Sequence, residues 1–152
     1  MEKIKINTAT VEDIEALADL LFILFIQEAD FKPDRQNQIK GLEILIGNPD
    51  KGFVLSAKEN NKIVGMVSVL RVVSTAEGGE VGILEDMVVS PFYRGLGIGS
   101  LLLAAAIEMA KAEQLTRLTL LTDLSNHRAI DFYTRFGFAQ SAMTPLRLYL
   151  DK

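Results

Sequence analysis

The chain has 152 residues, 49% of them hydrophobic and 24% charged, which predicts one globular domain spanning residues 1–152. Its net charge of −4 argues against nucleic acid and against an anionic membrane as partners. The sequence has no cysteine and only one histidine, His127, which excludes disulfides, an acyl-cysteine intermediate and Cys- or His-rich metal sites. We therefore expect no metal cofactor.

The apolar pattern bears on location. The segment MEKIKINTAT at the start lacks the apolar core of a signal peptide. The longest apolar run, residues 20–26, is far shorter than the ~20 residues that a membrane-spanning helix needs. We expect a cytoplasmic protein without membrane contact, and the sequence leaves a homodimer open.

The first part of the chain alternates strand and helix patterns. Residues 3–7 predict a strand, and residues 10–13 resemble a capping box, with Asp13 in place of Glu, that opens a helix. A second short helix is predicted over residues 36–46, ended by Gly47. Strand patterns then follow one another across turns and predict an antiparallel meander of residues 53–58, 63–73 and 81–89.

The second part adds a crossover. A helix over residues 99–114 and an apolar strand over 117–122 indicate a parallel partner for strand 81–89. A last helix, 129–136, is closed by Gly137, and the alternating tail 141–150 predicts one or two final strands. The fold class is therefore α/β, with helices packed on a mixed sheet.

Residues 84–100 carry the most informative pattern. A strand ends, a short turn follows, and Arg94 with three alternating glycines leads directly into a helix. Glycine lets the backbone adopt positive φ and approach a ligand closely. The N–H groups at a helix start converge on an anion, and Arg94 adds a fixed positive charge. This arrangement suits a diphosphate.

Other interpretations of this segment compete. A dinucleotide-binding fold has the same order of elements, followed by an acidic residue at about the distance of Asp123. Against it, residues 90–94 separate the strand from the glycines, and Ser100 replaces the third glycine of that fingerprint. A nucleotide-triphosphate loop would need a Gly-Lys-Ser/Thr ending, which is absent. The simplest interpretation is a glycine-rich turn that only allows tight packing.

Two landmarks resemble the GNAT superfamily of N-acetyltransferases. Residues 94–99 read Arg-Gly-Leu-Gly-Ile-Gly and match its Q/R-x-x-G-x-G/A signature, after a strand that carries residues 85–89. Residues 126–138 look like its N-x-x-A-x-x-F-Y-x-x-x-G-F segment. The resemblance implies a mixed, mostly antiparallel sheet of six or seven strands with about four helices. It also implies that the central parallel strands splay around acetyl-coenzyme A.

The resemblance assigns the cofactor contacts residue by residue. Backbone groups of Met87 and Val89 would pair with the pantetheine arm, and an N–H near Val88 would polarise the acetyl carbonyl. Asn126 would face the cofactor, although its residue type also suits a helix N-cap. The pyrophosphate would be held by Arg94, Gly95, Leu96, Gly97, Ile98, Gly99 and Ser100.

Two residues are predicted to be catalytic. Glu85 resembles the general base of several members, and the alternative is a buried ion pair with a residue such as Arg71. Strand alternation places Glu85 and Met87 on one face and Asp86 on the other, so Asp86 is predicted to be structural. Tyr133 would sit near the thioester sulfur as general acid, where the alternative is an ordinary core tyrosine.

The predicted activity is transfer of an acetyl group from acetyl-coenzyme A to the primary amine of a small molecule. Because the chain has no cysteine, direct attack within a ternary complex is the economical mechanism. Glu28 and Asp30, at the end of the first helix, are candidate contacts for a cationic amine, or simply solvated charges. The alternative function is a non-catalytic acyl-coenzyme A-binding or regulatory module.

Overall fold

The computed structural model describes residues 3–28 and 32–151, and its contacts divide the chain into two compact units, Met1–Leu120 and Leu121–Lys152. The first unit holds one sheet, with strands in the order β1-β2-β3-β4-β5. All neighbouring strands are antiparallel except β4 and β5, which are parallel. The expectation of one domain over residues 1–152 stays a prediction.

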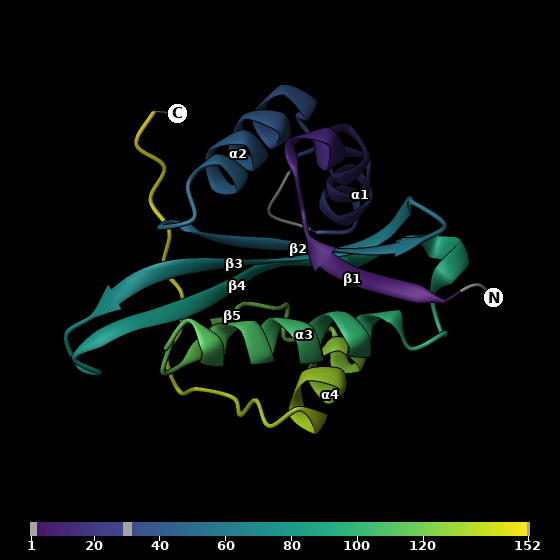
Figure 1. The fold of residues 1–152 in the computed structure, drawn as a ribbon. Coiled ribbons are helices and arrows are strands. Elements are labelled where there is room, and N and C mark those ends of the chain that lie inside the picture. The colour runs from purple at the N-terminus through teal and green to yellow at the C-terminus, as the bar shows by residue number, and fades with distance from the viewer. Residues whose placement is uncertain (1–2, 29–31, 152) are drawn as a thin grey trace. The chain divides into compact units, whose positions relative to one another are not determined.

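The elements lie close to their predicted positions. The strands are β1 (Ile4–Thr8), β2 (Gly52–Glu59), β3 (Lys62–Ser74), β4 (Gly79–Val89) and β5 (Leu118–Leu120). The helices are α1 (Ile14–Gln27), α2 (Arg35–Gly47), α3 (Ile98–Ala112) and α4 (His127–Arg135), with short 3₁₀ turns at Val11–Asp13 and Pro91–Tyr93. Within the first unit, α1 and α2 cover one face of the sheet and α3 covers the other (Figure 1).

The predicted capping box opens α1. The Thr10 N–H donates to Asp13 Oδ2 at 2.9 Å, and Lys58 Nζ of β2 lies 3.0 Å from Asp13 Oδ1. Burial opposes ionisation of Asp13, but the Thr10 N–H and Lys58 outweigh it and hold the pKa of this carboxyl below its usual value. The same carboxylate therefore starts the helix and ties it to the sheet.

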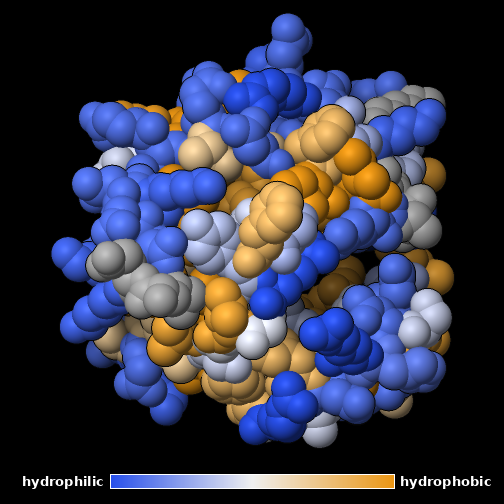
Figure 2. Space-filling view, turned by 90° about the vertical axis from the view of Figure 1, so that its right-hand side faces the viewer, coloured by the Kyte–Doolittle hydropathy of each residue, from blue (hydrophilic) through white to orange (hydrophobic). Residues whose placement is uncertain are grey.

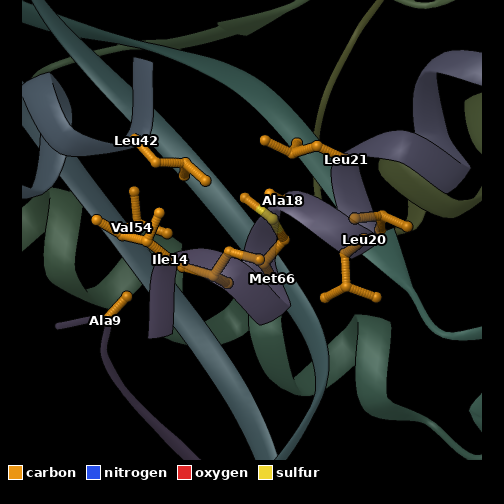
Figure 3. Packing of buried hydrophobic residues seen from close by; sticks show 10 residues of the cluster. Ala9, Ile14, Ala18, Leu20, Leu21, Leu42, Val54 and Met66 are labelled. Carbon is orange, nitrogen blue, oxygen red and sulfur yellow. The ribbon is translucent and has the colours of Figure 1, made fainter. Parts of the chain in front are cut away.

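The core on this face joins α1 and α2 to the central strands. Leu17 and Ala18 of α1 and Met66 of β3 are fully buried. Figure 3 shows α1 side chains beside Val54 and Met66 of the sheet, with Leu42 contributed by α2. Losing such a side chain, as in a Leu→Ala change, costs about 2–5 kcal/mol. This packing fixes α1 and α2 against the sheet.

The second unit consists of α4 and a tail. Gly137 has φ +99°; its N–H donates to the Thr134 carbonyl and the Phe138 N–H to the Tyr133 carbonyl, which is a Schellman motif. The rings of Tyr133 and Phe138 pack with centroids 5.6 Å apart. The predicted strands within 141–150 are wrong, because residues 138–151 contain no helix or strand. The sheet has five strands among the described residues, not six or seven.

Hydrophobic and hydrophilic side chains both reach the surface (Figure 2). Figure 2 shows one face on which a band of hydrophobic side chains lies between hydrophilic ones. No helix in the described part of the chain is long and apolar enough to cross a membrane.

Candidate active site

A β-bulge interrupts β4 in the middle of the sheet. Ser68 of β3 is opposite Asp86, but the next residue, Val69, is opposite Leu84. Glu85 is therefore an extra residue with no partner on β3. A bulge of this kind bends the strand and re-aims the side chains that follow it.

The bulge changes which face each side chain of β4 occupies. Before it, Gly82 lies against Leu115 and Leu118 on the α3 side of the sheet. After it, Val88 belongs to the core cluster formed with α1 and α2. In a regular strand these two even-numbered residues would share a face. The extra residue shifts the alternation, so that Asp86 joins Val88 on the α1 and α2 side.

A cavity of about 420 Å³ lies on this side of the sheet. Leu21, Phe25 and Leu42 form part of an apolar wall from α1 and α2. Its polar lining residues include Lys32, Asp34, Gln38, Lys51, Ser68, Glu85 and Asp86. The prediction that Glu85 and Asp86 lie on opposite faces is wrong, because the bulge lets both line the same cavity.

The two adjacent carboxylates differ in environment. Glu85 is exposed, whereas burial is the main cause that raises the pKa of Asp86 to about 7. The negative charges of Glu85 and Glu28 add to this rise, and a hydrogen bond from Ser68 opposes it. The carboxylate of β4 that is withdrawn from solvent is thus the half-buried Asp86 and not the exposed Glu85.

Ser68 holds the Asp86 carboxylate in place. The Ser68 Oγ–H donates to Asp86 Oδ2 at 3.0 Å, and the Asp86 N–H donates to Ser68 Oγ at 3.1 Å. Ser68 is itself almost completely buried. This pair of hydrogen bonds orients the carboxylate without supplying a positive charge.

The alternative role for Glu85, an ion pair with Arg71, is not found. The Arg71 guanidinium lies 2.5 Å from Glu80 Oε1 and 2.6 Å from Glu113 Oε2. The bond to Glu80 is the main cause that raises the pKa of Arg71 above its usual value. Arg71 therefore forms ion pairs with Glu80 and Glu113 instead.

Gln38 is an unusual member of the cavity wall. Its side chain is 7% exposed, and neither Nε2 nor Oε1 has a hydrogen-bond partner among the described residues. Leaving a buried amide unsatisfied costs about 1–3 kcal/mol, so native proteins rarely do so without a reason. Sequence reasoning missed this residue, since a glutamine on a short helix carries no signal of its burial.

The glycine turn has the backbone that the sequence predicts. Gly95 and Gly97 have φ of +78° and +84°, and a Cβ on either would meet nothing within 4 Å. Close packing is therefore not what requires glycine here; the left-handed backbone is. Gly97 is the N-cap of α3, and no side chain caps that helix. Its first N–H groups are thus left to an external acceptor.

Arg94 stands beside this helix start. Its side chain is exposed, and its Nε–H donates to the Val89 carbonyl at 3.1 Å. That bond anchors the side chain to the end of β4. The other guanidinium N–H groups make no hydrogen bond to a described residue and can bind an anion. The helix start and the guanidinium together form a cationic site suited to a phosphate group.

The end of β4 extends past its parallel neighbour. Pairing with β5 covers only Gly82, Ile83 and Leu84. Within the first unit, the stretch from Met87 to Val89 therefore has a strand partner on β3 but none on the β5 side. An unpaired strand edge offers alternating N–H and C=O groups to an extended ligand.

The remaining predicted residues lie in the second unit or near the end of α1. Asn126 Oδ1 accepts from the Ala129 N–H at 3.1 Å, which makes Asn126 the N-cap of α4. Tyr133 is half-buried and stacks edge-on with Phe132 and Phe138. Glu28 follows α1, and its negative charge contributes to the raised pKa of Asp86. Asp30 lies outside the described residues.

Known proteins resemble this chain along most of its length. The model of the acetyltransferase (GNAT) family matches residues 14–138. An aminoalkylphosphonate N-acetyltransferase of Salmonella typhimurium is 30% identical over 137 residues, 90% of this chain and 86% of that protein. A glucosamine 6-phosphate N-acetyltransferase of Trypanosoma brucei brucei is 31% identical over 86 residues, which cover 56% of each chain.

A solved structure supports the fold. An integron cassette protein from the mobile metagenome of Cole Harbour Salt Marsh is 26% identical, with a TM-score of 0.84. The similarity covers 97% of this chain and 91% of that one. The predicted mixed, mostly antiparallel α/β fold is thereby confirmed, apart from the number of strands.

Proposed function

Because the chain belongs to the acetyltransferase (GNAT) family, we propose that it transfers an acetyl group from acetyl-coenzyme A to the primary amine of a small molecule. The observation that carries this proposal is the uncapped start of α3, with Arg94 beside it and left-handed glycines before it. Such a site matches the diphosphate of coenzyme A. The amine attacks directly within a ternary complex.

The residues of the first unit fit the cofactor in chemical type. Arg94 and the backbone from Gly95 to Ser100 would hold the diphosphate. The open edge of β4 from Met87 to Val89 would pair with the amides of the pantetheine arm. Bound in this way, acetyl-coenzyme A supplies an activated thioester. Among the described residues, no group of three or more His, Asp or Glu side chains could hold a metal ion.

The cavity beside Asp86 is the proposed acceptor site. Its carboxylates suit an ammonium group, and Lys32 and Lys51 in its lining suit an anionic group on the same molecule. The names of two relatives refer to amines of that kind, an aminoalkylphosphonate and glucosamine 6-phosphate. We therefore propose a small acceptor that carries both an amine and an anion.

The chemistry requires two proton transfers. An amine with a pKa near ~10.4 is mostly protonated at neutral pH, and removing that proton costs roughly 4–5 kcal/mol. A carboxylate of the site accepts it, the role predicted for Glu85. Tyr133 is the proposed general acid for the departing thiolate. Positioning of the reactants supplies most of the remaining acceleration.

Melting curves and coenzyme A release test this function. Acetyl-coenzyme A should raise the melting temperature, since a ligand that binds only the native state stabilises it, and NADH should not. Amines that carry a phosphonate or phosphate should then release free coenzyme A. Stabilisation by NADH alone would favour the dinucleotide-binding interpretation. Stabilisation by acetyl-coenzyme A without release for any amine would favour the non-catalytic binding module.

Tyr133→Phe separates an enzyme from a binding module more directly. The ring of Tyr133 is kept in this change, and with it the contact with Phe138. Losing a general acid should lower kcat by ~10²–10⁴-fold, with little change in acetyl-coenzyme A affinity. Full turnover by the variant would return Tyr133 to a purely structural role.

A further inference from the structure

The cavity wall contains two carboxylates of different character. Glu85 is exposed at the bulge. Asp86 is oriented by Ser68 and lines the same cavity. We propose that Asp86, rather than Glu85, is the carboxylate that takes the proton from the acceptor amine. This inference rests on the proposed function.

The hydrogen bonds of Asp86 leave one oxygen available. Ser68 donates to Oδ2, and among the described residues no hydrogen bond reaches Oδ1. A general base must bring a free lone pair within hydrogen-bond reach of the proton that it removes. Because Ser68 fixes the carboxylate through one oxygen only, Oδ1 meets that need. The bulge is what brings the Asp86 side chain to the cavity side of the sheet.

The charges around Asp86 favour a proton acceptor that works near neutral pH. Glu85 on its own strand and Glu28 after α1 both repel its negative charge. Lys32, Asp34 and Lys51 also line the cavity, but no salt bridge joins a cation to Asp86 among the described residues. Burial is the leading cause that raises the pKa of Asp86 to about 7. A base is most efficient when its pKa lies near the working pH.

The proton balance is complete. The acceptor enters as an ammonium ion and loses one proton to Asp86 Oδ1, which frees the electron pair of its nitrogen. A bond forms between that nitrogen and the acetyl carbon while the carbon–sulfur bond of acetyl-coenzyme A breaks. The second proton of the nitrogen ends on the sulfur as the thiol. Asp86 then returns its proton to solvent.

Glu85 acquires a different role in this scheme. Its charge raises the pKa of Asp86, so that the neighbouring carboxylate keeps enough basicity to accept a proton. Glu85 is then a tuning residue that acts through Asp86. The two roles predict different pH profiles, and substitution of each carboxylate separates them.

The experiment measures coenzyme A release over a range of pH, with 2-aminoethylphosphonate and glucosamine 6-phosphate as probe amines. Asp86→Asn should lower kcat by ~10²–10⁴-fold, with partial recovery at high pH where free amine is abundant. Glu85→Gln should move the acidic limb of the profile to lower pH. Asp50→Asn, at an exposed turn, is the matched control for loss of a carboxylate and should leave the profile unchanged.

Ser68→Ala provides a test that leaves both carboxylates in place. It removes the donor that opposes the raised pKa of Asp86, so the acidic limb should move to higher pH, opposite to Glu85→Gln. A carbon-13 NMR titration of the Asp86 carboxyl, without any amine, should follow the same two shifts. Agreement between the titration and the kinetic limb is the expected result.

Loss of activity in Glu85→Gln with a normal rate in Asp86→Asn would assign the base to Glu85 and overturn the inference. The inference would also be overturned if the acidic limb of the pH profile were unchanged in both Glu85→Gln and Ser68→Ala. These results require an active wild-type protein. A wild-type protein that releases no coenzyme A with either amine fails the proposed function itself, and the inference falls with it.

Discussion

Two stretches of the β3–β4 ladder carry charge in opposite ways. Near the hairpin, Arg71 of β3 forms ion pairs with Glu80 of β4 and with Glu113 beyond α3. Each of these carboxylates therefore has a cation beside it. Farther along the same strands, the only hydrogen bond to the Asp86 carboxylate from a described residue comes from the neutral hydroxyl of Ser68, and its acidic neighbours repel its charge. A charge with an opposite partner can stabilise a structure, whereas a half-buried carboxylate without a cation costs stability, and such groups cluster at functional sites.

The largest expected effect is a gain of stability in Asp86→Asn. The native pKa of Asp86 is raised from 3.8 to about 7, so the native state binds a proton more tightly than the unfolded chain does. Wild-type stability should therefore fall as pH rises from about 4 to about 7. Three pKa units correspond to at most about 4 kcal/mol. Above pH 7 the variant should gain up to that amount, and below pH 4 it should gain nothing.

Urea unfolding at several pH values measures this gain. Asp50→Asn again controls for loss of an exposed carboxylate and should leave the curve unchanged. If Asp86→Asn is less stable than the wild type at high pH, Asp86 is not an uncompensated charge and the contrast with Arg71 disappears.

Arg71→Met should lower the stability of the protein, in contrast to Asp86→Asn. It leaves Glu80 and Glu113 facing one another without the guanidinium between them. We expect the melting temperature to fall by about 4 °C at neutral pH. The matched control is Lys111→Met, which removes an exposed cation from a pair with Glu108 and should change little. An equal effect of both changes would mean that the Arg71 cluster is no stronger than an ordinary surface pair.

Gly97→Ala tests the uncapped backbone N–H groups at the start of α3. An alanine at φ +84° is strained by about 1–2 kcal/mol, and the start of α3 should shift to relieve it. Gly78→Ala is matched, since Gly78 has φ +71° and equally open surroundings in the β3–β4 turn. Both variants should lose similar stability, but only Gly97→Ala should weaken acetyl-coenzyme A binding in a titration. Equal affinities would remove the glycine turn from the cofactor site.

Gln38→Leu should give the smallest effect. It replaces an unsatisfied buried amide by an apolar side chain of similar size, which should raise stability by about 1 kcal/mol. If the amide contacts the acceptor, KM for the amine should rise while acetyl-coenzyme A affinity stays the same. Leu42→Met, a conservative change in the same wall, is the control for altered packing. An unchanged KM would make Gln38 a packing residue.

Local signals in the sequence predicted most of the fold. The Thr10–Asp13 capping box and the glycine after α4 each act over a few residues and are found where they were expected. The strand patterns also predicted the positions of the five strands. The tail is the exception. Leu146, Leu148 and Leu150 alternate as in a strand, yet alternation specifies only a face and not the partner that a ladder requires.

The candidate site was less predictable. Arg94 and the glycines lie where the motif put them, because a helix start and its turn are local in the chain. The burial of Asp86 and Gln38 depends on how α1 and α2 pack on the sheet, which no short pattern encodes. The bulge at Glu85 could not be predicted from the sequence either, because its extra residue is not a glycine. An unbroken alternation therefore assigned Glu85 and Asp86 to opposite faces.

The bulge also makes the length of β4 part of the site. Replacing Glu85 by another residue alters one side chain, but deleting it would restore a single alternation along the strand. One half of β4 would then have to turn over, sending Asp86 toward the α3 core or Leu84 toward the cavity. Substitutions at this position can therefore vary the chemistry of the cavity gradually, whereas a one-residue deletion would remove it in a single step.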